Sequence, residues 1–69
     1  MKIYDETWAA DYREVKAFFH DHPGDVSVIS LPDRKIGAMT LPQTRIIIKG
    51  DNSDVLYRSF FQRFMKAGG

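Results

Sequence analysis

The sequence predicts a single α+β domain over residues 1–69, with two helices packed on a three-stranded antiparallel meander in the order α-β-β-β-α. Three observations predict this fold. Apolar residues follow a helical period near both ends of the chain, and three short apolar runs lie between them. Two similar segments, SLPDRKI at 30–36 and TLPQTRI at 40–46, separate those runs. Each segment places a proline after one run and a basic residue before the next, which is typical of turns between consecutive strands.

The first predicted helix ends at Asp21 and begins at one of two places. Its apolar residues recur at spacings of four, three and four positions, as on one helix face: Trp8, Tyr12, Val15 and Phe19. This pattern allows a start near Asp5. The segment from Asp11 to Glu14 is a capping-box pattern, so the regular helix alternatively begins there and leaves residues 2–4 as a lead-in or a short extra strand. The His-Pro-Gly sequence that follows ends the helix.

Three strands are predicted next, over residues 25–31, 35–41 and 45–50, followed by a helix that ends near Lys66. Side-chain alternation assigns each strand residue to one of two faces. The predicted core face holds Val26, Val28, Ile36, Ala38, Ile46 and Ile48. The opposite face combines an apolar centre with basic residues near the strand ends: Ser27, Ile29, Leu31, Lys35, Gly37, Met39, Leu41, Arg45, Ile47 and Lys49. We expect this second face either to be covered by a helix or to be presented to a partner.

The amino-acid composition argues against several classes of protein. The chain has no cysteine, so neither a disulfide nor a thiolate metal site stabilises it, and stability must come from packing or association. Ten Lys and Arg against nine Asp and Glu give a net charge of +1, which favours neither a strongly nucleic-acid-seeking nor a strongly acidic protein. No apolar run approaches the roughly 20 residues that span a bilayer. We therefore expect a cytoplasmic protein with no membrane partner.

Catalytic and metal-binding patterns are weak, and we expect a non-enzymatic protein without a cofactor or metal. His20 and His22 flank Asp21, but their position at a helix end is explained by the helix dipole. Ser53 lies between acidic residues, and helix capping explains that arrangement without a nucleophile. The sequence has no glycine-rich phosphate loop.

The last helix carries more apolar surface than one sheet contact requires. Its additional aromatic side chains either complete the small core or cover the second sheet face, or they form a protein-binding surface. The predicted contacts lie on the aromatic side of this helix, where aromatic residues and arginine are types enriched in binding hot spots, or on the second sheet face: Tyr57, Arg58, Phe61, Met65, Ile29, Met39 and Ile47. The expected partner is another protein, or alternatively a second copy of the chain. In size and lack of cysteine the chain resembles the accessory inhibitors of bacteriophages and other mobile elements, including anti-CRISPR proteins. That resemblance implies inhibition of a host protein by occlusion of its surface.

Nucleic-acid binding is the alternative function. Basic residues around the second sheet face are its predicted phosphate contacts: Arg34, Lys35, Arg45 and Lys49. The predicted α-β-β-β-α order also resembles the double-stranded-RNA-binding domain in length and topology. That family begins its last helix with a lysine cluster that contacts phosphates. Here the corresponding position reads Asn52-Ser53-Asp54, so the family's binding motif is absent.

Overall fold

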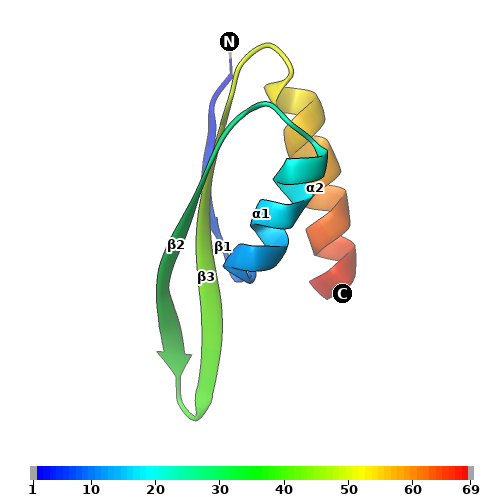
Figure 1. Ribbon diagram of the computed structural model, residues 1–69. Coiled ribbons are helices and arrows are strands. Elements are labelled where there is room, and N and C mark those ends of the chain that lie inside the picture. The colour runs from blue at the N-terminus through cyan, green and yellow to red at the C-terminus, as the bar shows by residue number, and fades with distance from the viewer. Residues whose placement is uncertain (1, 69) are drawn as a thin grey trace.

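The computed structural model describes residues 2–68 as a small α+β domain whose elements follow the order β-α-β-β-α. The elements are β1 (Tyr4–Trp8), α1 (Tyr12–Asp21), β2 (Asp25–Ile36), β3 (Met39–Lys49) and α2 (Ser53–Gly68). The three strands form one antiparallel sheet in the order β1-β3-β2, and both helices lie on the same side of it (Figure 1). The prediction of two helices and a three-stranded antiparallel sheet is confirmed. The predicted α-β-β-β-α order is wrong, because a strand precedes the first helix.

The region predicted as a three-stranded meander is one long hairpin. β2 pairs with β3 from Asp25 opposite Lys49 to Ile36 opposite Met39. The turn between them consists of Gly37 and Ala38. Gly37 has φ 61°, and no non-glycine residue among those described has a positive φ. Glycine at the first central position is the signature of a type II′ hairpin turn, whose twist matches that of the flanking strands.

The third strand is β1, which pairs with β3 from Tyr4 opposite Ile48 to Trp8 opposite Thr44. A strand therefore precedes the first helix, but it spans Tyr4–Trp8 and shares only Tyr4 with the residues 2–4 that were predicted as a lead-in or short extra strand. Trp8 belongs to this strand and not to the first helix. That helix starts at Tyr12 because the Asp11 side chain accepts hydrogen bonds from the backbone N–H of Arg13 (3.1 Å) and Glu14 (3.3 Å). The alternative that began the helix at the capping box is confirmed.

The two proline segments pair with each other and are not successive turns. Leu31 lies opposite Gln43 and Arg34 opposite Leu41, so two residues of β2, Pro32 and Asp33, face the single residue Pro42 of β3. This is a β-bulge, in an edge strand, where the missing N–H of proline is tolerated. β1 ends opposite Thr44, so β3 has also lost its second neighbour where Pro42 occurs.

Before the bulge, the sheet faces agree with the prediction. Ile46 and Ile48 are fully buried, and Val26 and Val28 lie directly across from them and pack on the same core. Two residues from each helix complete the buried core: Val15 and Phe19 of α1, and Leu56 and Phe60 of α2. The described core therefore lies between one face of the sheet and the two helices.

After the bulge, the face assignments of β2 are reversed, whereas Met39 and Leu41 of β3 stay on the predicted outer face. The extra residue shifts the alternation of β2, and directly paired residues share a face. Ile36, predicted in the core, lies across from Met39 on the face away from the helices and is 50% exposed. Lys35, predicted on that outer face, lies across from Thr40 on the helix side. Ala38 and Gly37 belong to neither face, because they form the turn.

The hairpin extends past the ends of the helices. Residues 31–43, here called the hairpin arm, continue beyond the end of β1, and the turn end of the arm projects below α1 and α2 (Figure 1). The molecule measures 41 × 21 × 19 Å. Pro42, at the other end of the arm, lines a pocket with Glu14 of α1 and Phe64 of α2. Within residues 2–68, neither helix has the length and hydropathy needed to cross a membrane.

Two buried hydroxyl groups hold the irregular segments to this framework. Thr44 Oγ1 donates to the Ala10 carbonyl at 2.8 Å, and Ser53 Oγ donates to the Lys2 carbonyl at 3.0 Å. Both side chains are buried, so each bond satisfies groups that lie away from water. Ser53 therefore serves a structural role at the start of α2.

Candidate functional site

The residues predicted to bind a partner fall on two separate surfaces. Four of them lie on α2, and the other three lie on the sheet face that α2 does not touch. We call the first surface the aromatic flank; it comprises Tyr4 and Trp8 of β1 with Tyr57, Arg58, Phe61 and Met65 of α2. We call the second surface the open face; it comprises the strand residues that point away from both helices.

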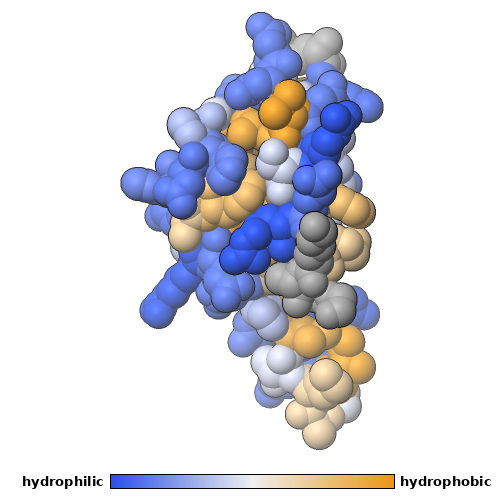
Figure 2. All heavy atoms as spheres, turned by 90° about the vertical axis from the view of Figure 1, so that its right-hand side faces the viewer, coloured by the Kyte–Doolittle hydropathy of each residue, from blue (hydrophilic) through white to orange (hydrophobic). Residues whose placement is uncertain are grey.

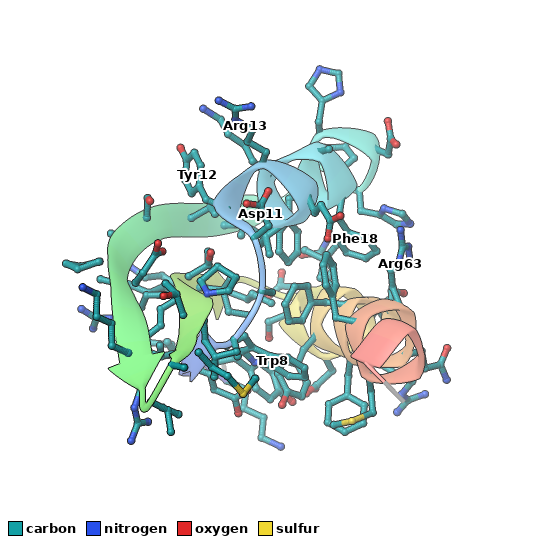
Figure 3. All side chains as sticks on the ribbon, turned by 90° about the horizontal axis from the view of Figure 1, so that it is seen from below. Trp8, Asp11, Tyr12, Arg13, Phe18 and Arg63 are labelled. Carbon is teal, nitrogen blue, oxygen red and sulfur yellow. The ribbon has the colours of Figure 1, made fainter. Side chains whose placement is uncertain are left out.

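The aromatic flank is a connected set of rings between β1 and α2. Tyr4 stacks on Tyr57 with ring centroids 4.2 Å apart and an interplanar angle of 3°. Trp8 meets Phe61 edge to face at 5.7 Å, and Tyr57 lies 6.1 Å from Phe61. Seen from below, Trp8 lies between the sheet and α2 (Figure 3). Phe61 is still 39% exposed, and Met65, one helical turn further along α2, is 50% exposed. The rings are therefore ordered by their neighbours and accessible from outside.

A shallow pocket of about 300 Å³ opens on this flank. Its lining combines aromatic rings with one acidic and one basic side chain: Tyr4, Asp54, Tyr57, Arg58 and Phe61. The Tyr4 hydroxyl donates a hydrogen bond to Asp54, and this bond raises the pKa of Tyr4. The pocket is suited to an inserted side chain, since its walls are apolar and its rim is charged.

Glu6 of β1 orders the aromatic flank by accepting hydrogen bonds from two of its aromatic side chains. The Tyr57 hydroxyl donates to Glu6 Oε1 at 2.8 Å and lies 3.0 Å from Oε2, and Trp8 Nε1 donates to Oε1 at 2.9 Å. One carboxylate of β1 therefore holds an aromatic residue of its own strand and one of α2. Burial, followed by the hydrogen bond to Glu6, raises the pKa of Tyr57 to about 12.

This pKa predicts a loss of stability at alkaline pH. An unfolded tyrosine ionises near pH 10, whereas folded Tyr57 resists ionisation until about 12. The contribution of Tyr57 is therefore complete below pH 10 and is lost as the pH rises from 10 to 12. We expect the free energy of unfolding of the wild-type chain to fall more steeply over this interval than that of Tyr57→Phe. Urea titrations at several pH values measure both slopes, and parallel slopes would contradict the assignment.

The open face is crossed by six rows of residues, each two positions from the next along β3. The rows are Asp25 and Lys49; Asp5, Ser27 and Ile47; Thr7, Ile29 and Arg45; Leu31 and Gln43; Arg34 and Leu41; and Ile36 and Met39. Ile29, Ile36 and Met39 are 39%, 50% and 63% exposed. Neither helix covers this face (Figure 1). Apolar side chains are visible on the arm even from the helix side (Figure 2).

Arg45 is held on the open face by an acidic neighbour. Arg45 Nε and Nη2 donate to Asp5 Oδ1 and Oδ2 at 2.9 and 2.7 Å, a bidentate pair that lowers the pKa of Asp5. Lys49 lies directly across from Asp25, and Arg34 lies in the arm beside Leu41. Lys35 is on the opposite side of the arm. The structure therefore does not gather the four predicted phosphate contacts into one basic patch.

Of the two histidines weighed for metal binding, His22 contacts Phe18 and His20 is exposed. His22 Nδ1 lies 3.0 Å from the Phe18 carbonyl oxygen, and its ring stacks on the Phe18 ring with centroids 4.2 Å apart. His20 is exposed at the end of α1. Among the described residues there is no group of three His, Cys, Asp or Glu side chains arranged to hold a metal ion.

Sequence reasoning missed the contribution of β1 to the aromatic flank. Tyr4, Glu6 and Trp8 alternate along the strand and supply two rings and the carboxylate that fixes them. The signal was a period of two across YDETW, but Trp8 also fitted the helical period of the following segment. Comparisons of the chain with protein-family models, with curated proteins and with solved structures found no match.

Proposed function

We propose that this chain is a small non-enzymatic protein-binding module that covers a surface of a partner protein with its aromatic flank. The observation that carries the proposal is the set of ordered, accessible rings around the pocket beside Arg58. Tyrosine, tryptophan and arginine dominate the binding energy of protein interfaces. Glu6 and the ring stacking hold the flank in place before binding, so little side-chain freedom is lost when a partner arrives.

The edge of β1 supports a specific form of binding. β1 is an outer strand, and within residues 2–68 no other strand pairs with its outer edge. Tyr4 belongs both to that strand and to the pocket. An extended partner segment that adds to β1 would gain backbone hydrogen bonds and place a side chain in the pocket, as in other strand-addition complexes.

Inhibition by occlusion is the biological role that we propose for such binding. A module that binds an extended segment of its partner and contacts the neighbouring surface with aromatic side chains would prevent other molecules from reaching that surface. We further propose that the chain acts as an accessory inhibitor of a bacteriophage or another mobile element, and that its target is a host protein.

A pull-down from bacterial extract with and without nuclease, read by mass spectrometry, tests the proposal. We expect a discrete protein to survive nuclease treatment and to be lost with Phe61→Ala or Arg58→Glu, each reducing affinity at least tenfold. Val55→Ala is the matched control, because Val55 is an exposed α2 residue outside the flank. Circular dichroism verifies that each variant is folded.

Two outcomes would overturn the proposal. If a captured protein is retained equally by both flank variants, the flank is not the interface. If nuclease removes everything that was captured, and Lys35→Glu with Arg45→Glu abolishes capture in steeply salt-dependent fashion, the chain binds nucleic acid instead.

A further inference from the structure

We propose that the outer edge of β2 binds an extended acidic segment of a partner protein as an added strand, beside basic side chains of α1. This edge is the opposite edge of the sheet from β1, because the strand order is β1-β3-β2. The surface is separate from the aromatic flank, so the inference does not rest on the proposed function.

The first part of the β2 edge lacks the features that usually prevent strand pairing. Within residues 2–68, β2 pairs only with β3, so the backbone groups along its other edge have no strand partner. The segment from Val26 to Leu31 reads VSVISL and contains neither a charge nor a proline. Natural edge strands usually carry charges, prolines or bulges that block further pairing. Here the bulge comes only after Leu31, so the segment before it is suited to an added strand.

A groove between this edge and α1 supplies side-chain contacts for such a strand. Its volume is about 310 Å³, and its lining comes from one side of α1 and one face of β2: Tyr12, Lys16, Phe19, His20, Val26 and Val28. Phe19 is buried, whereas the two valines pack on the core and stay partly exposed. Seen from below, Tyr12 projects from the side of α1 that is away from α2 (Figure 3). A strand added to β2 would therefore place alternate side chains against the valines and α1.

The charges of the groove indicate an acidic partner. Among the described residues, its lining contains two basic side chains, Lys16 and His20, and no carboxylate. Both are exposed and lie one helical turn apart on α1. Lys16 Nζ lies 5.5 Å from the centroid of the Tyr12 ring, and Lys16 forms no salt bridge within residues 2–68. A carboxylate in the groove would pair with Lys16 beside apolar walls, where salt screens the pair less than on an open surface.

A second copy of the chain does not supply this acidic segment. β1 carries two acidic residues and has an open outer edge, but both carboxylates are already engaged. Asp5 forms a bidentate pair with Arg45, and Glu6 accepts hydrogen bonds from the side chains of Tyr57 and Trp8. A nucleic acid lacks the peptide backbone that would continue the sheet. The partner is therefore a different protein, with an extended segment that carries a carboxylate between apolar residues.

Titration with a synthetic peptide tests the inference on the full chain. The probe is fluorescein-labelled Thr-Val-Thr-Glu-Thr-Val-Thr, whose glutamate and valines share one side of an extended strand. The matched control peptide has lysine in place of glutamate. We expect fluorescence anisotropy to show binding of the acidic peptide below about 1 mM, and binding of the lysine peptide that is weaker by about threefold or more. Amide hydrogen exchange should slow within residues 26–31 and not in β1.

Reversal of the Lys16 charge gives the sharpest comparison. Lys16→Glu should weaken binding of the acidic peptide about tenfold and invert the preference in favour of the lysine peptide. Lys35→Glu makes the same change in net charge in the hairpin arm, outside the groove lining, and should keep the preference for the acidic peptide. Circular dichroism verifies that both variants are folded.

Four results would overturn the inference. They are absence of binding at about 1 mM peptide, slowed exchange in β1 in place of residues 26–31, and an unchanged preference in Lys16→Glu. The fourth is slowed exchange in residues 26–31 that depends on the concentration of the chain without peptide, because a second copy would then occupy the edge.

Discussion

Replacing Phe60 by alanine is expected to destabilise the chain by about 3 to 5 kcal/mol. The Phe60 ring is fully buried and contacts rings from β1, α1 and α2. It lies 4.9 Å from Trp8, 5.3 Å from Phe19 and 4.6 Å from Phe64 between ring centroids. Because rings from three elements meet it, the space left by its removal cannot be filled by the shift of a single neighbour. The free energy of unfolding of a domain of this size rarely exceeds about 3 to 5 kcal/mol.

Comparison with Phe61→Ala separates the effect of burial on stability from the effect of removing a phenylalanine ring. Phe61 follows Phe60 in α2 and has the same side chain, but it is partly exposed and contacts Trp8 from outside the core. We expect Phe60→Ala to be largely unfolded in the absence of denaturant, while Phe61→Ala keeps a cooperative urea transition. Far-UV circular dichroism across a urea series measures both. Equal losses in the two variants would show that the helix packs differently from the arrangement described here.

Much of the fold follows from local patterns that the structure confirms. The spacing of Val15 and Phe19 predicted the buried residues of α1, although Tyr12 of the same pattern lies outside the core, and the capping pattern at Asp11 predicted the start of the helix. Alternation predicted the helix-facing side of the sheet up to the bulge. These signals are readable because each depends on residues within a few positions of one another.

The errors arose where pairing over longer distances decides the structure. A proline-containing segment can form either a turn or a β-bulge, and its sequence does not distinguish the two. Here the pairing of Leu31 with Gln43 and of Arg34 with Leu41 shows that the segment forms a bulge. The turn lies instead at Gly37, between apolar residues that look like strand interior. Once the bulge is present, every later residue of β2 changes face, so one misplaced turn moved both Ile36 and Lys35 to the wrong side.

The candidate surfaces were predicted in part for the same reason. Tyr57, Phe61 and Met65 follow a helical period and were recognisable from α2 alone. The hydrogen bond that orders Tyr57 comes from Glu6, in a strand about 50 residues earlier in the chain. The acidic residues of YDETW are uncommon in strands, so propensity did not favour one there. Pairing with β3 and packing on α2 overrode that weak preference.

Replacing Trp8 by alanine is expected to destabilise the chain by about 3 kcal/mol, the lower end of the range for a large aromatic residue, because Trp8 is only partly buried. Its indole contacts both Phe60 and Phe61 edge to face and donates to Glu6. Trp8→Phe keeps a ring but removes the N–H donor. We expect that variant to lose about 1 kcal/mol, the usual net value of a hydrogen bond. Urea unfolding compares the two variants.

Amide hydrogen exchange shows whether the lost energy belongs to β1. β3 residues 44–48 pair with β1, so release of β1 from the sheet would expose part of that segment as a new edge. We expect Trp8→Ala to accelerate exchange in 44–48 more than in α1, and Trp8→Phe to leave the pattern close to wild type. If Trp8→Ala instead lowers protection uniformly, Trp8 stabilises the core without specifically holding β1. Selective loss at 44–48 would mean that β1 is retained chiefly by its contact with α2, which is also the contact that orders the aromatic flank.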